Sequence, residues 1–431
     1  MINRGQSLDG DGYVEEIPYT YGYHPELAPS RMRFALLLAG YEAPEVRRAC
    51  ELGFGRGLSL AVHAAATDIH WYGNDLLPQH VAGLRELVAS SGARVTVFAE
   101  PFADFCTRDD LPSFDFIGLH GVWNWVSIEN RARIVDFLNT RLAPGGVVYF
   151  GHNSLAGWRS MLPLRRWLVA DVERSRAQGL TLADGIELAR TRAAELADPE
   201  LELPSRFLRG KSIAYLAHEL FNRDWHPMAF RDVEHALQRA DLAFVAEARG
   251  VDAFESLNFT APQRAQLGAL DRGAREDAKD RFLARKFRRD YFGKRGGLRV
   301  LSAAERLQRL QAQRIALACS RERAMADLVV GACAVRIDPQ RVARIVTLLA
   351  EHGPLSIGEI ATEPAEFSAA LECVALLIDR AAVALVINDS VDERIDHACR
   401  AVNERLSRLA QTQPEVTVRA HPVYGVGEPT G

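Results

Sequence analysis

The residues of this chain best suited to hold a ligand lie in one glycine-rich loop. The sequence reads Glu51-Leu52-Gly53-Phe54-Gly55-Arg56-Gly57 and continues as a helix-like apolar run over 58–65. Glycines at alternating positions let a backbone turn pass directly beneath a ligand, because they accept left-handed angles and carry no Cβ. The helix that follows points its positive end at the same place. The loop predicts a nucleotide or nucleoside pocket, the alternative being an ordinary tight strand-to-helix connection.

The residues around this loop decide which nucleoside it suits. A nicotinamide or flavin fingerprint has its third glycine one residue later, where this chain has Leu58, and no Lys-Ser or Lys-Thr pair follows for a triphosphate cradle. Two acids remain, Glu51 before the loop and Asp75 at the end of the second predicted strand. The first is placed to take a cationic amino group and the second to accept hydrogen bonds from a ribose diol. This pair indicates S-adenosylmethionine.

Polar and aromatic side chains gather after the fourth and fifth predicted strands, where a methyl acceptor would approach. His120 and His152 end these strands, and each is either a base for a hydroxyl acceptor or a hydrogen-bonded structural histidine. Asn124 and Asn153 offer carbonyl oxygens to an amine proton. Aromatic faces at the same place bind a cationic amine by cation–π attraction unless they pack in the core; these are Trp123, Trp125 and Trp158.

The elements that must position these residues alternate along the chain. Short apolar runs bounded by turn residues predict strands at 94–100, 114–121 and 145–151, and helical patterns at 78–91 and 129–142 lie between them. Such alternation predicts an α/β fold with a parallel sheet, helices on both faces and ligands at the carboxyl ends of the strands. The fold expected is therefore Rossmann-like.

The first 160 or so residues resemble a class I S-adenosylmethionine-dependent methyltransferase. The resemblance narrows to a bacterial group whose catalytic domain is followed by a methyltransferase regulatory domain. That group includes lysine methyltransferases of outer-membrane proteins, so the resemblance implies methyl transfer to a protein lysine. The blocks that carry it are 119–131 (LHGVWNWVSIENR), Gly157-Trp158, His218-Glu219, 224–230 (DWHPMAF) and 285–290 (RKFRRD).

The resemblance also implies which residues contact the methyl donor. The segment 19–25 is similar to one that closes over the donor in related enzymes, and residues just past the third strand are placed to contact adenine. The implied cofactor site consists of Tyr21, Glu51, Gly53, Phe54, Gly55, Gly57, Asp75, Leu76, Phe102, Ala103 and His120.

One position departs from the family pattern. Members often have Tyr-Asn after strand five, whereas this chain has His152-Asn153. A histidine titrates near neutral pH and accepts a proton, while a tyrosine mostly orients its neighbours. The alternative to a protein-lysine acceptor is therefore a small-molecule or glycan O- or N-methyltransferase that uses His152 or His120 as base. A scaffold without catalysis is a third reading, and the intact loop and Asp75 disfavour it.

Breaks and composition changes divide the chain into parts. A helix-then-strand pattern at 230–248 supplies the last strand that the catalytic fold needs, which predicts that this fold ends near 250. Short apolar segments in the acidic region after 339 resemble a winged helix. The predicted parts are a lid segment (1–30), a methyltransferase domain (31–250) with a helical insertion at about 156–225, a basic helical region (251–338), an acidic regulatory domain (339–412) and a flexible tail (413–431).

Charge is distributed unevenly along the chain. Residues 264–323 carry 17 Lys and Arg against 7 acids, and residues 339–400 carry 5 Arg against 10 acids. These stretches are expected to pack against each other or across a homodimer, unless they are solvated helix faces. A further alternative is that the basic stretch attracts an acidic protein substrate or a polyanionic glycan. The overall charge of −4 gives no case for nucleic acid or membrane binding.

The remaining composition indicates a large enzyme of the cytoplasm. No apolar run approaches the roughly 20 residues that cross a bilayer, and the first residues lack the pattern of a signal peptide. The six cysteines show no metal-type spacing, so reduced thiols and no metal site are expected.

Overall fold

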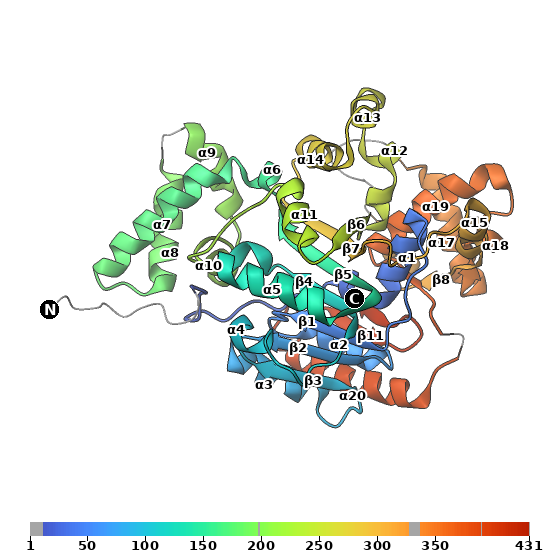
Figure 1. Cartoon of the computed structure of the whole chain (residues 1–431), viewed down its shortest axis with the longest axis horizontal. Coiled ribbons are helices and arrows are strands. Elements are labelled where there is room, and N and C mark those ends of the chain that lie inside the picture. The colour runs from blue at the N-terminus through green and yellow to red at the C-terminus, as the bar shows by residue number, and fades with distance from the viewer. Residues whose placement is uncertain (1–11, 197–198, 327–336, 389, 431) are drawn as a thin grey trace.

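The computed structural model describes residues 12–196, 199–326, 337–388 and 390–430, and its centre is a seven-stranded sheet (Figure 1). The strand order is β3-β2-β1-β4-β5-β7-β6; the first five strands of the chain pair in parallel, and β7 is antiparallel to both neighbours. The predicted Rossmann-like α/β sheet is confirmed. Its strands are β1 (Arg48–Leu52), β2 (His70–Asp75), β3 (Val95–Ala99), β4 (Phe114–His120), β5 (Leu142–Asn153), β6 (Leu242–Glu247) and β7 (Phe287–Lys294).

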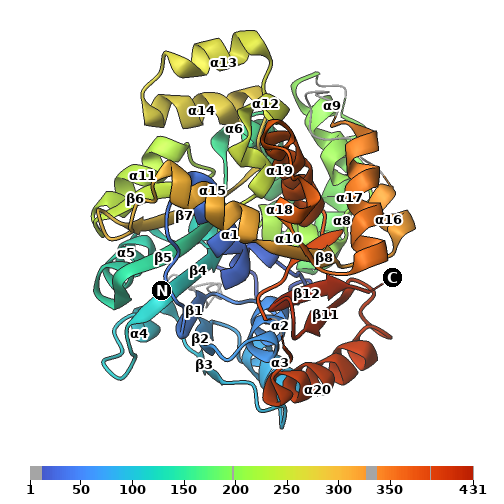
Figure 2. The same ribbon diagram turned by 90° about the vertical axis from the view of Figure 1, so that its right-hand side faces the viewer.

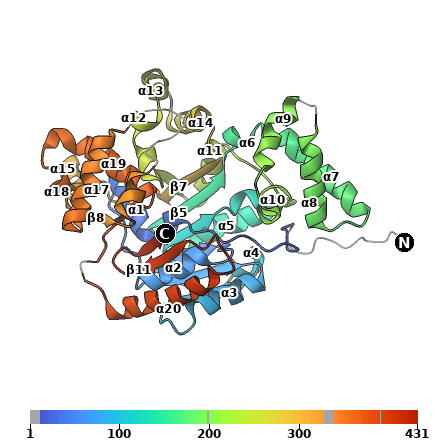
Figure 3. The same ribbon diagram turned by 180° about the vertical axis from the view of Figure 1, so that it is seen from behind.

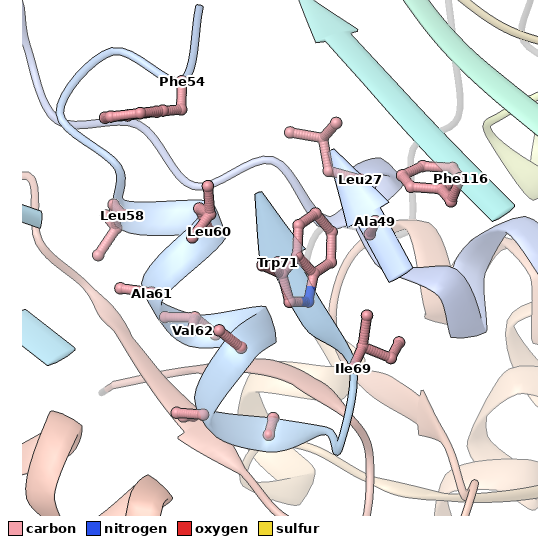
Figure 4. Close-up of a cluster of buried hydrophobic side chains, with 14 of the residues drawn as sticks. Leu27, Ala49, Phe54, Leu58, Leu60, Ala61, Val62, Ile69, Trp71 and Phe116 are labelled. Carbon is pink, nitrogen blue, oxygen red and sulfur yellow. The ribbon is translucent and has the colours of Figure 1, made fainter. Parts of the chain in front are cut away.

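Helices cover both faces of this sheet, and each face has its own apolar cluster (Figures 1 and 3). Figure 4 shows the first cluster, in which Leu60 and other side chains of α2 gather with Trp71 from β2 and Phe116 from β4. Trp71 and Phe116 are fully buried, so the helix seals the strands that carry the glycine loop. One face carries α1 (Pro29–Ala39), α2 (Leu58–Ala66) and α3 (Pro78–Val88), and the other carries α4 (Phe102–Phe105), α5 (Ile128–Arg141) and α11 (Phe230–Gln238).

The strand β7 lies in a stretch that was expected to be helical. The expectation that the catalytic fold ends near 250 was wrong, because β7 inserts between β5 and β6 and extends the sheet to Lys294. The charged residues of its sequence are typical of an exposed segment. Arg288 and Asp290 are nevertheless fully buried, and they form an ion pair with each other at 2.6 Å. Buried charges are tolerated when they are paired, and hydropathy patterns do not reveal such pairing.

The predicted helical insertion forms a separate lobe beside the ligand edge of the sheet, drawn in green at the left of Figure 1. Its helices pack around their own apolar cluster, which includes Trp158 and Trp225. The lobe begins directly after β5, so it stands over the ends of the central strands. It comprises α6 (Leu155–Trp158), α7 (Met161–Ala177), α8 (Leu182–Ala194), α9 (Pro199–Ser205), η3 (Arg206–Leu208) and α10 (Ile213–Leu220).

Short helices connect β6 to β7 and a second helical unit follows the sheet. The connecting helices are η4 (Gly250–Ala253), α12 (Glu255–Asn258), α13 (Ala261–Gly268) and α14 (Arg272–Phe282). The second unit contains a three-stranded sheet in the order β10-β8-β9. Its elements are α15 (Ala303–Ala312), β8 (Arg314–Leu317), α16 (Arg321–Met325), α17 (Pro339–His352), β9 (Leu355–Ser356), α18 (Ile357–Ile360), α19 (Pro364–Asp379) and β10 (Val383–Leu385).

This second unit does not follow the predicted boundary at 339. The strand β8 belongs to the basic stretch, yet it pairs with β10 and β9 of the acidic stretch. The two stretches therefore pack against each other within one chain, and a homodimer stays a prediction. Residues 327–336 of the predicted basic region lie outside the described residues.

The last part of the chain packs against helices of the seven-stranded sheet. The helix α20 (Glu393–Leu409) lies beside α2 and α3, as Figure 2 shows at the lower edge. A hairpin of β11 (Val418–His421) and β12 (Val426–Pro429) follows and also contacts α2. The prediction of a flexible tail was wrong for these residues, because buried Val418, Ala420 and Val426 give the hairpin an apolar face. Within the described ranges, no helix is long and apolar enough to span a bilayer.

Candidate active site

A pocket opens where the carboxyl ends of β1, β2, β3 and β4 meet, at the point where the strand order reverses. The segment 13–24 lies over it, and α10 of the helical lobe closes one side. It is lined by Tyr13, Tyr19, Thr20, Gly22, His24, Glu51, Gly53, Phe54, Gly55, Arg56, Asn74, Asp75, Leu76, Glu100, Pro101, Phe102, His120, Gly121, Val122, Trp125, Val126, Asn130, Tyr215, His218, Glu219 and Asn222.

The glycine loop forms the floor of this pocket, and its glycines are required by geometry. Gly53, Gly55 and Gly57 have φ angles of 64°, 59° and 71°, in the left-handed region that favours glycine. A Cβ on Gly53 would lie 2.7 Å from a methyl carbon of Val122, and one on Gly57 would lie 2.9 Å from Leu84 Cβ. The loop therefore holds its backbone against the neighbouring strand end and against α3 at once.

Asp75 braces the loop from the end of β2. Its carboxylate accepts hydrogen bonds from the backbone N–H of Gly55 at 2.8 Å and of Leu77 at 3.0 Å, and its Oδ1 lies 2.9 Å from Nδ1 of His80. The sequence predicted only a contact to a ribose. The structure adds that Asp75 fixes the loop on which a ribose would rest.

Glu51 is a buried acid with an unused oxygen. Its side chain ends β1 and lines the pocket, and its Oε2 atom is buried without a hydrogen-bond partner among the described residues. Burial raises the pKa of Glu51 to about 8, and the nearby charge of Asp75 adds to this shift. Such a carboxyl is ready to ionise when a cationic group enters the pocket. This is the strongest indication that the pocket takes a ligand with an ammonium group.

Two stacked imidazoles line the pocket at the end of β4. The rings of His24 and His120 lie 3.5 Å apart, and His120 Nδ1 is 2.8 Å from the hydroxyl of Tyr149. Burial lowers the pKa of His24 to about 4 and holds the pKa of His120 well below its usual range. Both rings are therefore neutral at neutral pH. His120 lines the pocket as predicted, but its lowered pKa makes it a weak base.

The opposite side of the pocket carries a second acid, Glu219 of α10. Its Oε1 accepts a hydrogen bond from Asn153 Nδ2 at 2.8 Å, and Trp125 Nε1 lies 3.5 Å from its carbonyl oxygen. Burial raises the pKa of Glu219 to about 7, against the effects of Asn153 and of the Lys286 charge. Aromatic residues surround it, because Tyr19, Trp125 and Tyr215 line the same space. This carboxyl was not among the predicted site residues, although His218-Glu219 belongs to the family block quoted above.

Several predicted acceptor-site residues have other roles. His152 is fully buried and neither ring nitrogen has a partner in the described structure; burial, with the Arg288 and Arg285 charges, lowers its pKa to about 3. Its assignment as an acceptor base was therefore wrong: the side chain points into the protein, where its nitrogens reach no ligand. Trp123 is also core, with its Nε1 donating to Met228 Sδ at 3.2 Å.

The two asparagines hold the backbone rather than an acceptor. Asn124 Oδ1 accepts from the Asn153 backbone N–H at 2.5 Å, and Asn124 Nδ2 donates to His226 O at 2.6 Å. Asn124 therefore ties strand β5 to the loop before α11. Asn153 reaches the site only through Glu219, which makes it a positioning residue.

The predicted cofactor residues fall into two groups. Tyr21, Gly57 and Ala103 do not line the pocket in the described structure; the Tyr21 hydroxyl instead accepts a hydrogen bond from Arg56 Nη2 at 2.8 Å. Within the described ranges, no group of three or more His, Cys, Asp or Glu side chains is arranged to hold a metal ion. The structure brings together the other predicted cofactor residues, namely Glu51, Gly53, Phe54, Gly55, Asp75, Leu76, Phe102 and His120.

The comparisons with known proteins agree with this architecture. Residues 212–294 match the family described as "Predicted methyltransferase regulatory domain". The matched stretch contains α10 with Glu219 as well as β6 and β7. The residues that match the regulatory-domain family therefore supply two strands of the seven-stranded sheet and one wall of the pocket.

Sequence relatives and solved structures extend the likeness beyond that segment. An uncharacterized protein of Synechocystis is 29% identical over 440 residues, covering 97% of this chain and 85% of the relative. PKMT2 from Rickettsia typhi in complex with AdoHcy superposes with a TM-score of 0.65 at 19% identity, over 85% of this chain and 77% of PKMT2. At this identity the likeness shows a shared fold, the Rossmann-like sheet with its added helices.

Proposed function

We propose that this protein is an S-adenosylmethionine-dependent methyltransferase that transfers methyl groups to an amine, with a protein lysine as acceptor. The observation that carries the proposal is the placement of two acids, buried Glu51 and half-buried Glu219, on the lining of one pocket. Each has a raised pKa, and each suits a different cation. Glu51 and the glycine loop fit the donor, and Glu219 with its aromatic neighbours fits an incoming ammonium.

The residues at the donor side fit the cofactor. When bound, S-adenosylmethionine supplies an electrophilic methyl group on a sulfonium. Glu51 would hold its amino group through the unused Oε2, and Asp75 would accept hydrogen bonds from the ribose hydroxyls. The absence of side chains on Gly53 and Gly55 leaves room for close approach of the donor to the backbone.

The acceptor side has the groups that an amine needs. Methyl transfer from a sulfonium is an in-line displacement, so the site must align the acceptor and exclude water. Tyr19, Trp125 and Tyr215 provide aromatic walls for this purpose. Glu219 can accept an N–H hydrogen bond from the ammonium and take its proton, because a pKa of about 7 matches that task. With the donor bound, the uncharged amine would be the nucleophile, and S-adenosylhomocysteine would leave as the carbon–sulfur bond breaks.

A base for a hydroxyl acceptor is less well provided. His152 is sealed from the pocket and His120 is held neutral and weakly basic, which disfavours the small-molecule O-methyltransferase alternative.

The buried free thiols Cys50, Cys373 and Cys399 suit a reducing compartment, in line with a location in the cytoplasm.

A labelled-methyl transfer assay tests the proposal. The protein is incubated with methyl-labelled S-adenosylmethionine and a bacterial protein extract, and we expect label in protein bands that acid hydrolysis resolves to methyl-lysine. Label found only in small molecules would contradict the lysine acceptor. Binding of S-adenosylhomocysteine by calorimetry tests the donor site separately, and Asp75→Ala is expected to weaken it at least tenfold.

A further inference from the structure

Two lysines lie over aromatic rings next to the Glu219 side of the pocket. Lys286 Nζ is 4.1 Å from the centre of the Phe207 ring and 5.2 Å from that of Trp158. Lys211 Nζ is 5.0 Å from the Tyr215 ring and 5.7 Å from the same Phe207 ring. The two ammonium groups therefore converge on one aromatic surface.

Within the described part of the chain, neither ammonium group forms an ion pair with a carboxylate. Glu219 acts on Lys286, and both lysines act on Glu219, through charge at longer range. Burial lowers the pKa of Lys286; the Glu219 charge opposes this shift, and repulsion from Lys211 adds to it. The two ammonium groups are neighbours on one aromatic surface and form no ion pair among the described residues. They are therefore suited to bind an anionic group of another molecule.

The arrangement of α10 connects this surface to the acceptor site. Tyr215 and Glu219 are four residues apart in α10, so their side chains share one face of the helix. Lys211 lies two residues before the helix, and its ammonium group lies over the Tyr215 ring. Lys286 joins them from the other side, because it precedes β7 and its carbonyl oxygen accepts the backbone N–H of Ser154 at the end of β5. The row runs from Glu219, which lines the pocket, to Lys211 at the exposed rim.

We propose that Lys211 and Lys286 form a docking site for an acidic side chain that flanks the acceptor lysine in a protein substrate. This proposal rests on the proposed function, and it adds that the enzyme prefers acceptor lysines with an acidic residue nearby in the sequence. Lys211 Nζ lies 5.0 Å from the Tyr215 ring, and Glu219 follows Tyr215 by four helical residues, a rise of about 6 Å, so the ammonium lies on the order of 11 Å from Glu219. An extended peptide advances roughly 3.3 Å per residue, so the acid recognised lies about three or four positions from the methylated lysine.

Peptide binding tests this proposal without depending on turnover. Two labelled peptides are compared by fluorescence anisotropy with the full-length protein and S-adenosylhomocysteine; each has one lysine, with either Asp or Asn three and four positions away. We expect the Asp peptide to bind about three- to tenfold more tightly at low salt, as two partly exposed ion pairs would give. The difference should shrink as salt is added.

Variants separate the docking site from general charge effects. In Lys211→Gln/Lys286→Gln the two peptides should bind equally, and Lys211→Arg/Lys286→Arg should restore the preference. Arg239→Gln removes one exposed cation after α11 and serves as the matched control, with the preference kept. Equal binding of both peptides to the wild type, or a preference that survives the double Gln change, would overturn the docking site.

The same peptides distinguish this proposal from the function on which it rests. Methyl transfer is measured in parallel on both peptides. A preference for Asp in binding without any methyl-lysine would refute the lysine-methyltransferase function and leave the acidic docking site in place. Methylation of both peptides without a binding preference would refute the docking site alone.

Discussion

The hydroxyl of Tyr23 accepts a hydrogen bond of 2.6 Å from the backbone N–H of Gly427, which joins the segment covering the pocket to the last hairpin of the chain. The same hydroxyl lies 3.1 Å from Nε2 of buried His63 in α2. A Cβ on Gly427 would come within 2.8 Å of the Tyr23 ring, so only glycine fits there. The next residue, His24, stacks on His120 in the pocket. The C-terminal hairpin thus helps to hold the cover of the active site.

Tyr23→Phe is expected to loosen this cover. The change leaves the Gly427 N–H unpaired, which should cost about 1–2 kcal/mol and lower Tm by a few degrees. We also expect weaker binding of S-adenosylhomocysteine, measured by calorimetry. Tyr72→Phe is the matched control, because the Tyr72 hydroxyl has no hydrogen bond among the described residues. Unchanged Tm and affinity in Tyr23→Phe would show that the hairpin does not support the cover.

Gly53→Ala is expected to disable the donor site. The added methyl group would meet Val122 at 2.7 Å in a backbone conformation that side chains disfavour, so the loop must shift. S-adenosylhomocysteine should bind at least about tenfold more weakly by calorimetry, a loss of about 1.4 kcal/mol. Gly83→Ala in α3 is the control, since a Cβ there meets nothing within 4 Å and should be neutral or stabilising. A Gly53 variant with normal affinity would place the donor elsewhere.

The raised pKa of Glu51 makes donor binding depend on pH. In the free protein the carboxyl keeps its proton up to a pKa of about 8, so its contribution to stability is full at low pH and is lost as pH rises through 8. A bound ammonium group favours the ionised carboxylate and releases this proton. Affinity for S-adenosylhomocysteine should therefore rise several-fold between about pH 6 and about pH 7.5.

Calorimetry in buffers of different ionisation enthalpy checks this prediction. Wild type should release a fraction of a proton on binding at neutral pH, and Glu51→Gln should bind more weakly with no such release. Proton uptake, or the same pH profile in Glu51→Gln, would contradict the assignment of Glu51 to the amino group.

Glu219→Gln is expected to affect turnover more than donor binding. The amide keeps a hydrogen-bonding atom for Asn153 but cannot take a proton from the acceptor. We expect kcat for lysine methylation to fall by about 100-fold and the limb of the pH–rate profile near 7 to disappear, while calorimetric affinity for S-adenosylhomocysteine changes little. Glu195→Gln at the exposed end of α8 is the control. A kcat within a few-fold of wild type would remove Glu219 from the reaction.

His152→Leu tests whether His152 acts as a base for the acceptor. Both of its ring nitrogens are buried without partners, so an apolar side chain of similar size should be neutral or stabilise the fold by about 1 kcal/mol, seen in denaturant unfolding. Methyl transfer should continue at a rate close to that of wild type. A loss as large as that predicted for Glu219→Gln would return His152 to the list of candidate bases.

The sequence alone located most of the predicted donor-side residues that line the pocket. Gly53, Gly55 and Gly57 are local requirements of a turn with left-handed angles, and Asp75 follows a short apolar strand whose end is visible in the pattern. The alternation of strands and helices likewise predicted a parallel sheet with helices on both faces, although not the order of its strands. These features depend on residues close together in the chain, and periodicity and turn chemistry report such features directly.

Only the tertiary structure decided the acceptor side and the extent of the sheet. Asn153 and Glu219 are separated by 66 residues and meet across the helical lobe, so no local pattern joined them. The strand β7 was hidden because Arg288 and Asp290 neutralise each other inside the protein. The fate of His152 also depended on its surroundings, which the residue type does not specify. The physical reason is the same in all three cases. Burial and pairing determine the protonation state and the role of a polar side chain, and both arise from contacts between residues distant in sequence.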